Sequence, residues 1–76
     1  MTQFDVAYRY ASKLSDATMR ALDSVREVYG VRGIRLDEGA RVIRVEFDAS
    51  RLKEPVIAGL LRKAGLDLQE KLVLTQ

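Results

Sequence analysis

Residues 31–47 read VRGIRLDEGARVIRVEF, and this stretch decides the fold. Apolar side chains recur on both sides of a short polar segment, residues 37–40, and the Glu-Gly step at its centre supports a tight turn. In the second half, Ile43, Val45 and Phe47 alternate with more polar neighbours and therefore share one side of a strand. The stretch predicts a β-hairpin with this apolar set turned inward.

The residues before the hairpin predict a strand and then a helix. A period of two in residues 4–11 indicates a half-buried strand with its aromatic side chains inward. Ser15 and Asp16 suit a helix N-terminus, and from Ala17 onward the apolar spacing is helical. Gly30 is expected to end the helix because glycine adopts a positive φ readily. The expected buried stripe contains Ala21, Leu22, Val25, Val28 and Tyr29.

The residues after the hairpin predict a second helix and a last strand. Residues 48–53 form a connector, Pro55 fits the first turn of a helix, and Gly65 ends that helix. Leucines at alternating positions from Leu66 to Leu74 predict a strand, with an irregularity near Gln69. The expected buried stripe of the second helix contains Val56, Ile57, Leu60, Leu61 and Ala64.

The predicted order is strand, helix, strand, strand, helix, strand. Each helix has one apolar stripe and each strand one apolar face, so both helices are expected on one side of a four-stranded antiparallel sheet. This is an α+β, ferredoxin-like βαββαβ sandwich, and residues 1–76 are expected to form a single domain.

Composition excludes several kinds of chemistry. The 76 residues include no cysteine and no histidine, so thiolate nucleophiles, thiolate metal sites and imidazole acid–base catalysis are absent. No catalytic motif is present, and we predict neither enzyme activity nor a cofactor. A net charge of +2 is too small to indicate nucleic acid by itself. Without a signal peptide or a run of about 18 apolar residues, a cytoplasmic protein without a membrane span is expected.

The sequence from Ala21 onward resembles the heavy-metal-associated domain of copper chaperones and metal-transporting P-type ATPases. Residues 21–25 (ALDSV) are similar to the first helix of that family. Residues 30–36 (GVRGIRL) and 42–48 (VIRVEFD) resemble its GVxxVxV and VxVx[FY]D strands. Ile57, Leu60, Leu61, Ala64 and Gly65 follow the spacing of its second helix. The resemblance implies the ferredoxin-like fold and a role related to metal transport.

This chain lacks the metal-binding motif of the family that it resembles. Its members carry MxCxxC between the first strand and the first helix, where two thiolates hold a soft metal. The corresponding positions lie near Leu14 and Ala17, and the loop from Tyr10 to Ala17 contains neither Cys nor His. No family ligand can be transferred to this chain. We therefore expect a metallochaperone-like domain that has lost its CxxC site and acts by binding a protein.

Two surfaces are candidates for a partner. The first is the loop and helix start that docks partners in the family, which here offers Lys13, Asp16 and Arg20. The same charges also suit an ordinary solvated helix start. The second is the side of the sheet away from the helices, which could also pair with a second copy of the chain through Val42 and Val73.

Nucleic acid is an alternative ligand for that open side of the sheet. Its expected basic residues are Arg9, Arg35, Arg44 and Lys71. Arginines contact phosphates, but single-strand readers also stack bases on exposed aromatic rings. The aromatic residues of the strands are expected in the core, and Asp5 and Glu46 on the open side would repel phosphate.

Weak metal binding through oxygen ligands is a further alternative. Asp37 and Glu38 are adjacent in the predicted turn, and Asp48 follows the next strand. Hard cations need several convergent oxygen ligands, and no EF-hand-like series is present. Acidic residues in a turn more often serve the geometry of the turn.

Overall fold

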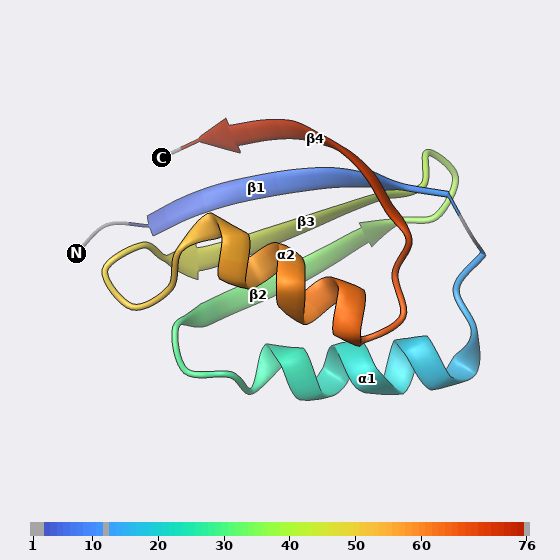
Figure 1. Ribbon diagram of the computed structural model, residues 1–76, viewed down its shortest axis with the longest axis horizontal. Coiled ribbons are helices and arrows are strands. Elements are labelled where there is room, and N and C mark those ends of the chain that lie inside the picture. The colour runs from blue at the N-terminus through green and yellow to red at the C-terminus, as the bar shows by residue number, and fades with distance from the viewer. Residues whose placement is uncertain (1–2, 12, 76) are drawn as a thin grey trace.

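The computed structural model describes residues 3–11 and 13–75, with side chains described through Leu72. Four strands form one antiparallel sheet in the order β2-β3-β1-β4, and both helices lie on one side of it (Figure 1). The chain has the ferredoxin-like α+β fold, as the sequence predicts. The elements are β1 (Gln3–Tyr10), α1 (Asp16–Arg26), β2 (Val31–Asp37), β3 (Val42–Asp48), α2 (Glu54–Lys63) and β4 (Leu68–Thr75).

The predicted hairpin is confirmed as β2 and β3, but its turn differs in detail. Asp37 pairs with Val42, so residues 38–41 form a four-residue turn. The residue with positive φ is Arg41 at 55°, not Gly39 in the predicted Glu-Gly step. The Arg41 side chain donates to the carbonyl of Ala11 at 2.6 Å, and its own carbonyl accepts from the N–H of Tyr10. These contacts with the end of β1 stabilise the left-handed conformation.

Helix α1 begins as predicted and ends earlier. The Ser15 hydroxyl accepts from the N–H of Thr18 at 3.1 Å, which is an N-cap bond. The helix ends at Arg26, and Gly30, with φ 102°, closes the connector that follows rather than the helix itself. The early end places Tyr29 outside the buried stripe, where it is 72% exposed. Its predicted burial is wrong because the helical period no longer applies to it.

Helix α2 agrees with the prediction except at one apolar position. Pro55 lies in its first turn, and Gly65, with φ 111°, follows its C-terminus. A Cβ on Gly65 would lie 2.7 Å from the Thr18 hydroxyl oxygen, so glycine also allows α1 and α2 to meet closely. Ile57 and Leu61 face the sheet, whereas Val56 is exposed, contrary to prediction.

Strand β4 contains the predicted irregularity and a second one. Its pairing with β1 skips Gln69 and then Leu72. The paired residues are Tyr10 with Leu68, Arg9 with Glu70, Tyr8 with Lys71, and Ala7 with Val73. Each skipped residue is a β-bulge, which changes the side of the sheet that later side chains occupy. The predicted place of Val73 on the open side concerns a side chain outside the described residues.

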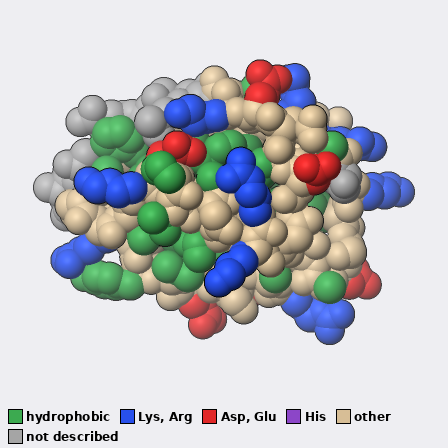
Figure 2. All heavy atoms as spheres, viewed as in Figure 1, with side chains coloured by type: hydrophobic (Ala, Val, Ile, Leu, Met, Phe, Trp, Pro, Cys, Tyr) green, Lys and Arg blue, Asp and Glu red, His purple; other side chains and the backbone are tan. Residues whose placement is uncertain are grey.

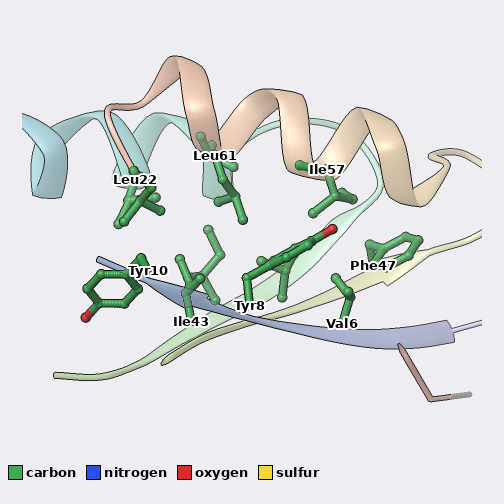
Figure 3. Packing of buried hydrophobic residues seen from close by; sticks show 13 residues of the cluster. Val6, Tyr8, Tyr10, Leu22, Ile43, Phe47, Ile57 and Leu61 are labelled. Carbon is green, nitrogen blue, oxygen red and sulfur yellow. The ribbon is translucent and has the colours of Figure 1, made fainter. Parts of the chain in front are cut away.

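The core lies between the sheet and the helices. Side chains from β1 and β3 meet Leu22, Ile57 and Leu61 from the two helices (Figure 3). The predicted inward sets of both central strands are confirmed, with Phe4 only half-buried. No helix in the described part of the chain is long and apolar enough to cross a membrane.

Candidate functional site

The predicted docking residues lie at the start of α1 and are exposed. Lys13 precedes the helix, and Asp16 and Arg20 lie one turn apart on it. The Arg20 Nε donates weakly to the Asp16 carbonyl at 3.5 Å. Asp16 is the acidic residue of the first turn, where a negative charge is favoured by the helix dipole. These contacts describe an ordinary helix start and do not define a ligand site.

Leu14 and Ala17, the two positions near which the resemblance would place the family cysteines, offer no ligand atoms. Leu14 is half-buried against the core, and Ala17 is exposed. Leu14 therefore contributes to packing.

The proposed oxygen ligands are not brought together. Asp37 and Asp48 lie at opposite ends of the hairpin. The Asp37 carboxylate accepts from the N–H of Ala40 at 3.2 Å, and hydrogen bonds from the Ser50 side chain and N–H hold the pKa of Asp48 below its usual value. Within residues 3–11 and 13–75 there is no group of three or more side chains suited to a metal.

The open face of the sheet carries its charges in an unusual order. We define the open face as the side away from the helices, where the side chains of β1 and β3 that alternate with the core set lie. Arg35 of β2 pairs directly opposite Arg44 of β3, and we call these two the arginine row. Asp5 of β1 pairs directly opposite Glu46 of β3, and these two form the carboxylate row. Each row thus places two like charges side by side.

The charges of these two rows have no partner within the described structure. Among the described residues, no ion pair joins any member of either row. By contrast, Arg9, also on this face, pairs with Glu70 of β4 at 3.0 Å. The predicted positions of Arg9, Arg35 and Arg44 on one face therefore agree with the strand register, but Arg9 is engaged and the other two are not.

Lys71 lies on the other side of the sheet, and its predicted place on the open face is wrong. It pairs in register with Tyr8, which points toward the helices, and its Nζ lies 3.7 Å from the Glu54 carboxylate of α2. The bulge at Gln69 shifts β4 by one residue and reverses the side on which Lys71 lies. The periodicity of a regular strand could not predict this reversal.

A polar cluster between β1, β4 and α2 was missed by the sequence analysis. The buried Tyr8 hydroxyl donates to the Glu54 carboxylate, which also faces Lys71. Burial, followed by the hydrogen bond to Glu54, raises the pKa of Tyr8 well above its usual value. A pocket of about 300 Å³ lies beside the cluster, with Arg62 at its border. Because the cluster is internally satisfied, we assign it to structure.

A second missed feature joins the two connectors at one end of the sheet. The Arg51 guanidinium lies 4.7 Å from the centre of the exposed Tyr29 ring, in a cation–π contact. The N–H of Asp48 donates to the carbonyl of Gly30 at 2.7 Å and holds the connectors together. Tyr29 lies in a connector and not on the open face, so it provides no stacking platform there.

The helix side of the molecule has its own surface pattern. Figure 2 shows apolar side chains gathered on this side, with Lys and Arg side chains around them. Between the helices runs a shallow groove lined by Val25, Val28, Leu60 and Ala64 among others.

Comparison with known proteins gives no identification. No protein-family model matches the chain, and no curated protein is significantly similar to it. The function must therefore be argued from the site.

Proposed function

We propose that the chain is a non-catalytic, cytoplasmic protein-binding domain of the heavy-metal-associated type, without the metal site of that family, and that the open face is its binding surface. The fold and the motifs of β2, β3 and α2 support the type. The absence of Cys and His from the sequence supports a role without soft-metal transfer.

The observation that carries the proposal is the pair of like-charged rows on the open face. A solvated sheet face is stabilised when opposite charges lie across from each other, and like charges directly opposite destabilise it by a few tenths of a kcal/mol, up to about 1. The chain does this twice, at Arg35–Arg44 and at Asp5–Glu46. Opposite charges from a partner that lie over each row would remove this repulsion.

The open face also has apolar surface between its charges. Val42 is half-buried at the edge of a hollow of about 180 Å³, which Arg35, Asp37 and Arg44 also line. A protein surface can fill such a hollow with side chains and place carboxylates on the arginines.

Nucleic acid has less support as the ligand. The strand aromatics Tyr8, Tyr10 and Phe47 are buried in the core, so they cannot stack on bases. The carboxylate row adjoins the arginine row and would repel a phosphate backbone. A protein partner with both signs of charge fits both rows.

Site-specific photo-crosslinking in cells tests the proposal. A photoreactive amino acid replaces Val42 on the open face, and a control replaces Met19 on α1, which is also exposed. We expect crosslinks to a protein from position 42 that disappear when Arg44→Glu is added. The absence of any protein crosslink from position 42, or crosslinks that do not respond to Arg44→Glu, would refute the open face as a protein-binding surface.

A further inference from the structure

We propose that the partner of the open face is a second copy of this chain, bound sheet to sheet in a two-fold symmetric dimer. The inference rests on the proposed function, because it names the occupant of the same surface. The order of the charges along β3 indicates this partner.

The two charge rows are neighbours along the strands. Arg44 and Glu46 are two residues apart on β3, so the arginine row and the carboxylate row lie about 7 Å apart on one face. A two-fold axis that runs across the strands between the rows places Arg44 over Glu46 of the other copy, Arg35 over Gly33 and Asp5 over Ala7. An axis parallel to the strands would instead place like charges over each other. The charges therefore select an orientation in which the two β3 strands run antiparallel.

The details of the register strengthen this match. In this arrangement Arg44 of one copy lies over Glu46 of the other, and Arg35 lies over Gly33. The Glu46 carboxylate itself leans over Gly33, because a Cβ built there would lie 3.1 Å from its Oε1. Both arginines of one copy thus meet a carboxylate of the other. Face-to-face sheets pack about 10 Å apart, a separation that an arginine and a glutamate side chain span together.

The size of the face indicates a weak dimer. Four strands of seven or eight residues present a face of about 20 Å by 20 Å. Two such faces together bury about 800 Å², which is less than a stable interface buries and falls among weak, transient contacts. We expect weak, transient self-association, and a dimer that weakens with salt because charge pairs dominate its contacts.

Charge reversal with mixing tests the dimer. Arg44→Glu and Glu46→Arg each place like charges over each other in the homodimer, and each is expected to weaken self-association at least about tenfold. An equimolar mixture of the two variants restores opposite charges and is expected to form a heterodimer at close to the original affinity. Arg20→Glu on α1 is the control for charge, and circular dichroism checks that every variant is folded.

The measurement is sedimentation velocity from micromolar to millimolar concentration. A chain that stays monomeric throughout, single variants that dimerise like the original, or a mixture that stays monomeric would each overturn the proposed dimer. Crosslinking at position 42 distinguishes a failure of the proposed dimer from a failure of the proposed protein-binding surface. Crosslinks to a different protein from a monomeric chain overturn only the dimer, and a complete absence of protein crosslinks overturns both.

Discussion

The covered side and the open face of the sheet differ in how their polar side chains are paired. The side under the helices is largely apolar, and the Tyr8 hydroxyl buried there donates to Glu54. The described residues contain no buried side-chain nitrogen or oxygen without a partner. On the open face, Arg35 faces Arg44 and Asp5 faces Glu46, and among the described residues no ion pair joins any of these four side chains.

This difference separates the residues that maintain the fold from those available for binding. A side chain on the covered side is determined by its packing, so a change there is expressed as lost stability. No helix packs on the open face, and the two like-charged pairs there are each unfavourable within a single chain. The following variants test this contrast and are ordered by the expected change in stability.

Ile57→Ala should have the largest effect. Ile57 is fully buried between α2 and the sheet, and its truncation leaves a cavity that the neighbours fill only in part. We expect a loss of about 3 kcal/mol in the free energy of unfolding, measured by urea titration. Val42→Ala on the open face is the matched control, with an expected loss of about 1 kcal/mol or less. Equal losses at the two positions would contradict the contrast between the faces.

Tyr8→Phe removes the hydrogen bond to Glu54 and keeps the ring. We expect a loss of about 1–2 kcal/mol in the free energy of unfolding, because Glu54 keeps Lys71 as a partner but loses its buried donor. Tyr29→Phe, at an exposed ring, should change stability by less than about 0.5 kcal/mol. If both variants lose the same amount, the Tyr8–Glu54 bond does not stabilise the covered side.

Stability should fall at alkaline pH because of the same buried phenols. Burial raises the pKa of Tyr8 and of Tyr10 above the value in the unfolded chain, so the folded state holds these protons more tightly. Their contribution is complete below about pH 10 and is lost as the pH rises toward the raised pKa values, at up to about 1.4 kcal/mol per pH unit for a group that is still protonated in the folded state. Urea titrations between pH 8 and 12 measure the slope, which should be smaller in Tyr8→Phe. An unchanged slope in that variant would exclude Tyr8 as a source.

Arg35→Glu should stabilise the monomer slightly. The new carboxylate faces Arg44 across the strands and replaces a repulsion with an attraction, so we expect a gain of about 0.5 kcal/mol, measured at low protein concentration. Arg32→Glu is the matched control because Arg32 is exposed on the same strand but is skipped in the pairing with β3. The difference should shrink in 1 M salt. If the two variants have the same free energy of unfolding, Arg35 and Arg44 do not repel each other measurably, and the proposed function loses its main support.

Gly33→Ala should have the smallest effect on folding. The new methyl group approaches the Glu46 carboxylate, whose flexible end can move by a few tenths of an ångström, and alanine lowers the entropy of the unfolded chain. We expect a change within about 0.5 kcal/mol, together with weaker self-association because Glu46 leaves its place over Gly33. A large loss of stability would mean that the Glu46 side chain is held rigidly.

Patterns within the sequence were sufficient to predict the elements, their order and most of the core. The period of two in β1 and β3, the helical spacing around Leu22 and Leu61, and the N-cap at Ser15 each follow from local geometry. Together they leave one economical packing, with two helices on one side of the sheet. Composition likewise excluded cysteine and histidine chemistry without any coordinates.

Which charges lie next to each other depends on the packing of the whole molecule. The register between β2 and β3 set Arg35 against Arg44, the bulges in β4 moved Lys71 to the helix side, and the early end of α1 released Tyr29 to the surface. The Tyr8–Glu54 bond joins residues that are 46 positions apart. Strand register and bulges depend on how the whole sheet packs against the helices, and periodicity within one segment carries no information about them.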